Sequence, residues 1–333
     1  MKSLTLRGLR IFEAAASAGN FSRAAELLEL TQPAVSLQIK QLEEEVGTPL
    51  FDKQARPIVL TDAGREFLRH ARTILAQVRT AEDALASLEG SFKGQLHLGV
   101  VSTGHYFAPV LLAAFRRKFP EVRMKLTLGT RDEILAMLGD HRLDIAIAGY
   151  PPAQADVEAE AFARHPHCIV AAPDHPLAGA TRIEWEELAG EPFLFREAGS
   201  ATRQFLEHLL QCRSVHVNVS TEFEGTETIK QAVMAGLGIT FVSAHAIQTE
   251  LMANRMVILD VIDMPKLLDW CILTRRDSLL SPVKQAFREF VLAEGVALTQ
   301  CTSAPDRRPG LPTQTRSGLS VVPQAAARCL LPG

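Results

Sequence analysis

Apolar residues repeat with helical spacing through the first 90 residues. Residues 4–18 place most of their apolar side chains on one helical face, and a short second helix is predicted over residues 23–28. A third helix begins after Thr31, a suitable N-cap, and tolerates Pro33 in its first turn. It continues to about Val46. Three such helices in close succession predict a helical hairpin of the helix-turn-helix kind.

The third helix has one apolar and one polar face. The inward apolar stripe consists of residues spaced by four, three and four positions, namely Val35, Ile39, Leu42 and Val46. The N-terminal part of the opposite face is polar and uncharged. After Gly47, short apolar pairs alternate with Lys53, Arg56 and Pro57 up to Thr61. This alternation predicts a two-stranded wing beside the helix.

A long helix follows, with a narrow apolar stripe spaced alternately by four and three residues. Such a stripe over three heptads predicts a coiled-coil seam between two chains. The alternative is a long helix that packs on its own domain, which usually needs a wider apolar face. The predicted seam comprises Phe67, Ala71, Ile74, Val78, Ala81, Leu85 and Leu88.

Beyond Gly94 the pattern changes to alternating strands and helices. A first series covers residues 95–149 and a second covers 167–243, so we expect two similar α/β lobes, each built on a parallel sheet. Later strands at 256–261 and 268–274 and a helix from Ser281 suggest that the chain returns to the first lobe. Two crossings between lobes imply a hinge.

Composition narrows the function only slightly. The net charge of −3 excludes a protein coated in basic charge, but a few local Lys and Arg side chains suffice to hold DNA. No apolar run could span a membrane and no signal pattern begins the chain, so we expect a cytoplasmic protein. The five widely spaced cysteines indicate reduced thiols, without a disulfide framework, a metal site or a cofactor; they are Cys168, Cys212, Cys271, Cys301 and Cys329.

The third helix carries the groups that read DNA. A long amide and a hydroxyl in its first turns, at Gln32 and Ser36, can contact base edges in the major groove, and Gln32 can pair bidentately with adenine. Such a contact contributes about 1–3 kcal/mol of discrimination. Cations near it would hold phosphates and set the register, namely Arg23, Lys40, Lys53 and Arg56.

The chain resembles the LysR-type transcriptional regulators. The match lies in LRIFEAAASAGNFSRAAELLELTQPAVSLQIKQLEEEVGTPLF, then LTDAGREFL, and continues to about residue 295. The resemblance implies a homodimer or homotetramer that binds double-stranded operator DNA and regulates transcription, with RNA polymerase as a further partner. It places Thr31, Gln32, Pro33, Ser36 and Lys40 at the recognition-helix positions of the family. The full set of predicted DNA-binding residues is Ser22, Arg23, Thr31, Gln32, Pro33, Ser36, Lys40, Lys53 and Arg56.

The expected fold class is α/β, with an N-terminal winged helix-turn-helix, a long linker helix and a two-lobed effector-binding domain that resembles periplasmic binding proteins. The domain limits are 1–60 for the winged helix-turn-helix, 61–91 for the linker dimerisation helix, and 92–298 for the effector-binding domain. Lobe 1 covers about 92–164 and 268–298, lobe 2 covers about 165–267, and residues 299–333 form a tail of disordered composition.

Four strand-to-helix junctions in the two lobes are rich in glycine and hydroxyl residues. Ligands collect beyond the C-terminal ends of parallel strands, where helix N-termini offer free N–H groups, although each junction alone is an ordinary capping sequence. Cations nearby, with Lys230 among them, favour a small carboxylate or phosphate metabolite. The effector-binding residues are predicted to be Ser102, Thr103, His105, Thr130, Arg131, Arg196, Ser200, Thr202, Arg203, Thr226 and Thr228.

Within the family, the chain is similar to regulators of Calvin-cycle (Rubisco) carbon fixation operons, which respond to phosphorylated metabolites. The similarity lies in LGVVSTGHYFAP, AIAGYPP, REAGSATR, ETIKQAVMAGLGITFVS and LSPVKQAFREF. Five places depart from that group, so a regulator of another metabolic operon with a different effector stays open. In this chain His105 stands where that group has Lys, Thr130 where it has Asn, Tyr150 where it has Arg, Ala201 where it has Gly, and Gly225-Thr226 where it has Ser-Asn.

Two other classes of protein fit less well. An enzyme would need a nucleophile with a base, or a phosphate loop, and the sequence contains neither pattern. His165, His167 and His175 lack convincing metal-ligand spacing, and a structural or hinge role is favoured for them. A solute-binding protein would resemble the second half but leaves the first 90 residues unexplained.

Overall fold

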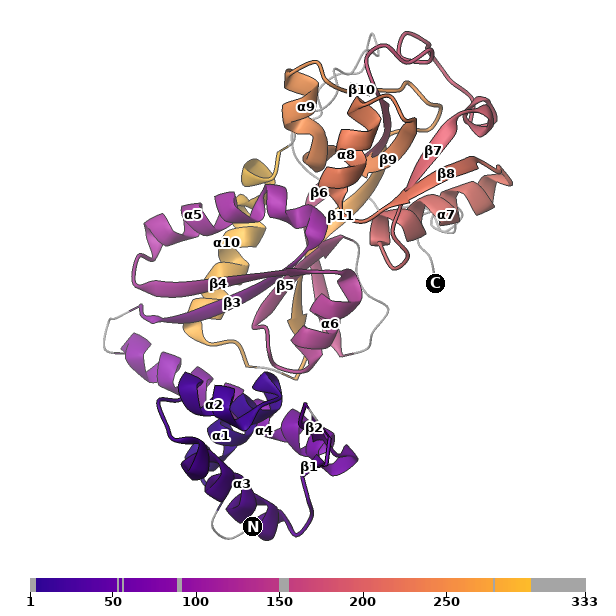
Figure 1. Cartoon of the computed structure of the whole chain (residues 1–333). Helices are drawn as coiled ribbons and strands as arrows, with labels where there is room; N and C mark the ends of the chain where they lie inside the picture. Colours follow the sequence, from indigo (N-terminus) through magenta and orange to yellow (C-terminus); the bar gives the residue numbers. More distant parts are fainter. Residues whose placement is uncertain are drawn as a thin grey trace.

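The computed structural model describes residues 4–300 except 53, 56, 89–91, 150–155 and 278. Figure 1 shows a helical N-terminal domain, a long helix beside it, and two α/β lobes beyond. This arrangement confirms the fold class expected from the sequence. None of the helices in the described residues combines the length and apolar character needed to cross a membrane.

The N-terminal domain is a winged helix-turn-helix. The ring of Phe12 is fully buried and meets the rings of Phe51 and Phe67 edge-on, at centroid distances of 5.4 and 5.1 Å. Thr5, Asn20 and Thr31 cap the three helices through their side chains. The elements are α1 (Leu6–Ala18), α2 (Phe21–Leu27), α3 (Gln32–Val46) and the antiparallel pair β1 (Phe51–Asp52) and β2 (Val59–Leu60).

The long helix α4 (Asp62–Leu88) starts against the wing. Thr61 caps it by accepting a hydrogen bond from the Gly64 N–H at 3.0 Å. A Cβ on residue 64 would lie 2.0 Å from the Leu50 carbonyl oxygen, so only glycine lets the helix approach the wing this closely. The start of α4 is therefore fixed by local contacts.

The first two positions of the predicted seam along α4 pack against the core of their own chain. Ala71 is buried within the N-terminal core of its own chain, with Leu68 and Leu75, and Phe67 packs on Phe12. The helix-turn-helix uses this half of the stripe, because its own three short helices leave an apolar surface to cover. The remaining positions are half-buried or exposed in one chain, and stay a predicted seam: Ile74, Val78, Ala81, Leu85 and Leu88.

Lobe 1 packs its helices around three parallel strands. Its core contains Leu98, Ile134, Phe115 and Phe287, all fully buried. The elements are β3 (Gly94–Val101), the 3₁₀ turn η1 (Ser102–Tyr106), α5 (Ala108–Lys118), β4 (Val122–Gly129), α6 (Arg131–Gly139), β5 (Ile145–Gly149) and, at the end of the chain, α10 (Pro282–Leu298).

Lobe 2 repeats this pattern with helices on both faces of its strands. One core contains Phe193, Phe205 and Phe241, and the other contains Leu194 and Ile229. The elements are η2 (Glu187–Gly190), β7 (Pro192–Arg196), α7 (Ala201–Arg213), β8 (Asn218–Phe223), α8 (Thr226–Met234), β9 (Ile239–Ser243), η3 (Ala244–Ile247), α9 (Gln248–Met252) and β10 (Val257–Ile258).

Two long strands, β6 (Val157–Ala171) and β11 (Lys266–Arg275), run between the lobes. In the described residues they join both lobes into one nine-stranded sheet of order β4-β3-β5-β11-β6-β9-β7-β8, with β10 on β6. The expectation of purely parallel sheets is wrong here. β11 is antiparallel to β5 and β6, and β6 is antiparallel to β9, because the chain crosses in one direction along β6 and returns along β11.

The limits given for the domains and lobes stay predictions. The tail predicted to be disordered lies outside the described residues from Cys301 onward, and so does Cys329. The described cysteines, Cys168, Cys212 and Cys271, are thiols that form no disulfide with one another.

Candidate DNA-binding and effector sites

The N-terminal half of α3 presents the predicted reading residues to solvent. The Gln32 amide donates a hydrogen bond to the Ser36 hydroxyl at 2.8 Å, one helical turn further on. Gln32 and Pro33 are exposed and Ser36 is half-buried. Thr31 uses its hydroxyl to accept from the Ala34 N–H at 3.4 Å, so it shapes the helix start. Gln32 and Ser36 are thus the side chains free to exchange their mutual bond for contacts to a base.

The predicted phosphate-binding cations are exposed and weakly paired. Arg23 bonds to Glu26 at 2.7 Å and Lys40 lies 3.7 Å from Glu44, within single helices. Exposed pairs of this kind contribute about 0.2–1 kcal/mol, so a phosphate can displace the carboxylate. Ser22 is exposed beside Arg23. Lys53 and Arg56 lie outside the described residues.

One exposed apolar side chain on α3 was missed by the sequence analysis. Leu37 is 55% exposed and follows Ser36 directly. An apolar group on a recognition helix can contact the methyl group of thymine. The inward stripe of Val35, Ile39 and Leu42 already excluded Leu37 from the core, so the signal was present.

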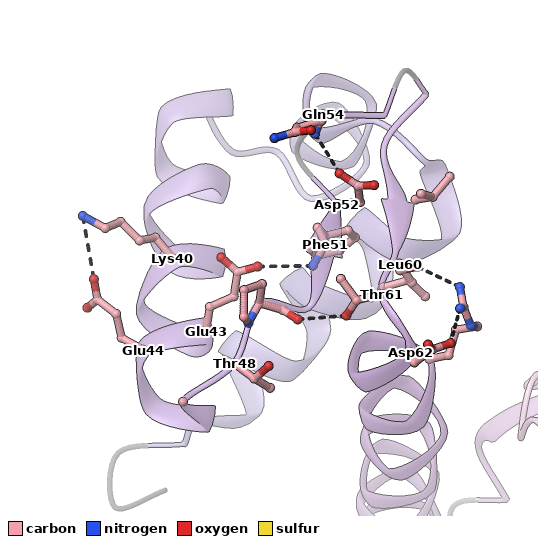
Figure 2. Close-up of a pocket in the computed structure, with 14 residues that line it drawn as sticks. Lys40, Glu43, Glu44, Thr48, Phe51, Asp52, Gln54, Leu60, Thr61 and Asp62 are labelled. Atoms are coloured by element: carbon pink, nitrogen blue, oxygen red, sulfur yellow. Dashed lines mark hydrogen bonds and ion pairs between the residues drawn. The ribbon is translucent and has the colours of Figure 1, made fainter.

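A groove of about 980 Å³ lies between the C-terminal half of α3, the wing and the start of α4 (Figure 2). Within it the buried Glu43 carboxylate accepts from the N–H groups of Leu50 and Phe51, at 2.9 and 3.2 Å. The Thr61 hydroxyl donates to the Pro49 carbonyl at 2.8 Å. These bonds fasten the wing to α3, so the polar groups here have a structural role. The groove is remote from the effector junctions.

On lobe 1 the predicted effector residues form two groups. Ser102, Thr103 and His105 lie on η1, and His105 donates from Nδ1 to the Ser102 carbonyl at 2.5 Å. Thr130 forms a complete capping box with Glu133 at the start of α6, which is the ordinary capping role. Arg131 donates to the Gly149 carbonyl at 2.8 Å.

At the start of α8, a carboxylate of the chain itself occupies the expected anion position. Glu197 accepts from the Gly225 N–H at 3.1 Å and from the buried Arg196 guanidinium at 2.6 and 2.7 Å. Arg196 also donates to the Thr226 hydroxyl at 2.6 Å. Partial burial acts to raise the pKa of Glu197, but these hydrogen bonds hold that pKa below its usual value. An effector would have to displace Glu197 there.

The start of α7 is different, because no carboxylate among the described residues is bonded to its N-cap N–H as Glu197 is at α8. Ser200 is the N-cap residue but makes no capping hydrogen bond, and the hydroxyl residues Ser200 and Thr202 are both buried. Arg203, in the first turn, is bonded to the carboxylates of Glu207 and Glu222. Of the predicted junctions on lobe 2, this one therefore offers backbone N–H groups to an anion.

A pair of residues not predicted from the sequence joins the two lobes. Tyr106 on η1 donates from its hydroxyl to the Glu227 carboxylate on α8. Burial and this hydrogen bond raise the pKa of Tyr106. The Lys230 ammonium lies 5.1 Å from the Tyr106 ring centre and is paired with Glu227 and Glu250. Thr228 is exposed on the same helix. Glu227 and Tyr106 were missed because their pairing depends on the lobe arrangement.

Three histidines lie buried where the lobes meet. The ring of His165 stacks on Trp270 at 3.8 Å and bonds to the Ser243 hydroxyl at 3.0 Å. Nε2 of His245 donates to the Thr299 carbonyl at 2.9 Å. Burial lowers the pKa of all three, that of His167 to about 3, so they are neutral at pH 7. Among the residues that the structure describes, no cluster of His, Cys, Asp and Glu could hold a metal ion.

Comparisons with known proteins match both halves of the chain. Residues 6–65 match the model of bacterial regulatory helix-turn-helix proteins of the lysR family, and residues 89–295 match the LysR substrate-binding domain. The HTH-type transcriptional regulator CbbR of Sinorhizobium medicae is 45% identical over 306 residues, covering 92% of this chain and 98% of that protein. The RuBisCO operon transcriptional regulator of Allochromatium vinosum is 42% identical, covering 89% and 98%.

Solved structures agree with the fold. The regulatory domain of Synechocystis CcmR, determined in complex with 2-PG, has a TM-score of 0.58 and 32% identity, covering 60% of this chain and 97% of that one. Full-length OxyR of Pseudomonas aeruginosa has a TM-score of 0.72 at 22% identity, covering 93% and 99%. The latter likeness supports the fold alone, from the helix-turn-helix to α10.

Proposed function

The chain belongs to the LysR family of bacterial regulatory helix-turn-helix proteins, and from this membership we propose that it controls carbon fixation genes in response to a small anionic metabolite. As a member of this family it is a DNA-binding transcriptional regulator. The observation that supports control of carbon fixation genes is the similarity, over most of the chain, to two CbbR regulators and to a RuBisCO operon transcriptional regulator, at 42–46% identity.

The proposed effector is a phosphorylated two-carbon or three-carbon acid. CcmR was solved with 2-PG, 2-phosphoglycolate, which carries a phosphate and a carboxylate. The uncapped start of α7 suits one anionic group, because backbone N–H groups and the hydroxyls of Ser200 and Thr202 would surround it. The second anionic group would then compete with Glu197 for Arg196, or with Glu227 for Lys230. Ligand binding thereby alters the contacts that join the lobes.

The remaining partners follow from this role. Operator DNA is read by Gln32 and Ser36, with RNA polymerase as the partner in activation, and the protein works in the cytoplasm beside the chromosome. A homodimer or homotetramer forms through the exposed half of α4, whose Leu85 and Leu88 are 64% and 82% exposed in one chain. No cofactor and no catalytic activity are proposed.

A gel-shift titration tests the proposal. The protein should retard the intergenic DNA upstream of its own gene in preference to an unrelated fragment of equal length, and 2-phosphoglycolate should change that affinity. Absence of sequence preference, with and without ligand, would contradict the regulator role. Preference for the DNA combined with no response to phosphorylated acids would point to another metabolic operon.

A pair of variants separates the effector site from the DNA site. Thr202→Val should weaken 2-phosphoglycolate binding by about tenfold, which is 1.4 kcal/mol, while leaving unliganded DNA binding intact. Thr221→Val, an exposed change on β8, is the matched control and should bind as the wild type does. Isothermal titration calorimetry measures the ligand and fluorescence anisotropy the DNA.

A further inference from the structure

A buried arginine on α4 connects the two halves of the chain. Arg72 is 6% exposed, and its Nη1 lies 3.2 Å from the carboxylate of Asp140, directly after α6 of lobe 1. On its other side Nε lies 3.6 Å from the Glu13 carboxylate on α1. One guanidinium therefore contacts the DNA-binding domain and the effector domain at once.

A second contact adjoins the first. The Thr73 hydroxyl bonds to Nε2 of His141 at 2.9 Å, and His141 is buried in a left-handed backbone conformation with φ of 56°. Burial and the nearby Arg275 lower the pKa of His141 to about 4, so the ring is neutral at pH 7 and the bond needs no ion pair. We call Arg72, Thr73, Asp140 and His141 the linker joint.

Helix α6 leads from the linker joint to the effector side of lobe 1. Its first residue, Arg131, donates a hydrogen bond to the Gly149 carbonyl at the end of β5. Thr130 is the N-cap of α6. Its middle is anchored by the buried Ile134, Leu135 and Leu138. Nine residues span about 14 Å at a rise of 1.5 Å per residue. A shift at its start therefore moves its end as a rigid unit.

The end of α6 also receives a cation from the strand that crosses between the lobes. Arg275 of β11 donates from Nη1 to the Leu138 carbonyl at 3.0 Å. Cations favour the negative end of a helix dipole, and Arg72 and Arg275 both lie there. The two arginines come from α4 and from β11, so the same helix end contacts both elements.

We propose that α6 carries the effector signal to the DNA-binding domain, and that Arg72 is the positioning residue through which it acts. The proposal rests on the proposed binding of an anionic effector at the start of α7, which would alter the contact between Tyr106 and Glu227 that joins the lobes. Ligand binding at the lobe junction shifts α6, the shift changes the Arg72 contacts, and Glu13 transmits the change to α1. Coupling of this kind is reciprocal, so operator DNA must also affect α6.

The first test is a double-mutant cycle on the full-length chain. Arg72→Met, Asp140→Asn and the double variant are compared with Arg288→Met, a control that removes a half-buried ion pair with Glu160 elsewhere in lobe 1. The measured quantity is the ratio of operator affinities with and without 2-phosphoglycolate. In the joint variants this ratio should fall below about twofold, from a wild-type value within the usual range of about 5–150.

The outcomes are distinguishable. The affinity for 2-phosphoglycolate itself should stay within about twofold of wild type in Asp140→Asn, and the double variant should lose no more coupling than either single one. An unchanged ratio in Asp140→Asn would overturn the proposal. Should Arg72→Met fail to fold, as judged by its thermal melt, Asp140→Asn decides, because it leaves Arg72 its contact with Glu13.

A second readout needs no effector. Hydrogen–deuterium exchange of the full-length protein should show that the upstream DNA alters exchange in the α6 peptide, and that this response is lost in Asp140→Asn. A wild type that ignores 2-phosphoglycolate but shows the DNA response refutes the effector proposed above and supports the coupling through α6. An α6 peptide that is equally unresponsive in all variants refutes that coupling.

Discussion

At the scale of single residues, the side chains proposed to read DNA are neutral and already organised. Gln32 and Ser36 are hydrogen-bonded to each other, while the nearby cations Arg23 and Lys40 are paired with carboxylates. Holding Gln32 in one geometry lowers the conformational entropy lost when it meets a base. We therefore propose that specificity for DNA comes from Gln32 and Ser36, and that affinity comes mainly from the cations.

Gln32→Ala should relax base preference at one operator position. The loss of a bidentate contact costs about 1–3 kcal/mol at that position, while nonspecific binding keeps its dependence on salt. Anisotropy titrations against operators randomised at single positions measure this. Lys40→Ala is the contrasting variant, with a uniform loss over all sequences and a smaller salt slope. A uniform loss in Gln32→Ala instead would exclude direct readout by Gln32.

Glu43→Ala should destabilise the DNA-binding domain by about 1–3 kcal/mol. The substitution leaves the N–H groups of Leu50 and Phe51 without their buried acceptor at the wing. Figure 2 shows the bond between Glu43 and Phe51. Thermal unfolding followed by circular dichroism checks this. Glu44→Ala, one residue further on and exposed, is the control and should change stability by less than about 0.5 kcal/mol. Equal effects of the two substitutions would show that the Glu43 bonds contribute little.

At the scale of elements, α4 has two differently covered halves. Leu68, Ala71 and Leu75 belong to the core of the helix-turn-helix, whereas Leu85 and Leu88 are exposed. The heptad spacing predicted an apolar stripe correctly but could not say what covers it. Spacing reports which face of a helix is apolar, and the partner depends on tertiary structure.

Val78→Asp with Leu85→Asp should convert the oligomer to monomers and abolish operator binding together. The exposed half of the stripe is where a second chain would pack, and paired recognition helices are needed for both half-sites. Analytical ultracentrifugation and gel shift measure the two effects. Arg79→Asp, an exposed change about 100° around the same helix from Val78 and outside the stripe, serves as the control. A double variant that sediments like the parent would refute the seam.

The helices and strands themselves were largely predictable, but strand directions were not. The sequence placed β5, β7 and β9 within two residues, because apolar runs and turn residues are local signals. It missed that β6 and β11 are antiparallel to their neighbours, because strands buried on both faces give apolar runs in either direction.

At the scale of the whole molecule, the junction of the lobes is built around neutral histidines. His165, His167 and His245 lie buried with depressed pKa values, so the unfolded chain binds more protons than the folded one below about pH 6.5. The stability that they permit is complete above that pH. This stability is lost progressively as the pH falls from about 6.5 to the pKa values of the three histidines in the folded protein. The pKa of His167 there is about 3.

Stability should therefore fall as pH is lowered from 6.5, by up to about 1.4 kcal/mol per pH unit for each histidine that stays neutral. Urea unfolding at pH 8, 7, 6 and 5 measures the slope. His167→Phe, whose ring would keep the stacking on Phe241, should reduce the slope below pH 6, whereas exposed His216→Gln should not. The same slope in His167→Phe and wild type would count against this account.

The effector site was the least predictable part of the molecule. Sequence reasoning found the helix starts, which are local, and the structure assigns Thr130 to ordinary capping. It could not find that Glu197 occupies the start of α8 or that Tyr106 reaches Glu227, because these contacts join segments 28 and 121 residues apart. The Glu197 contact forms only once lobe 2 has folded, and the Tyr106 contact forms only once the two lobes lie side by side.

The ladder between β6 and β11 limits how the lobes can move. Its pairing runs from Lys266 opposite His167 to Arg275 opposite Val157, through both lobes. Opening the lobes like a clamshell would break several backbone hydrogen bonds at about 1 kcal/mol each, whereas a twist of the strands breaks none. We therefore expect ligand binding to change the angle between the two lobes. The helix α4 has 27 residues and is about 40 Å long. A rotation of about 5° around its middle would displace each end by about 2 Å. This displacement is more than half of the rise between successive base pairs, which is about 3.4 Å.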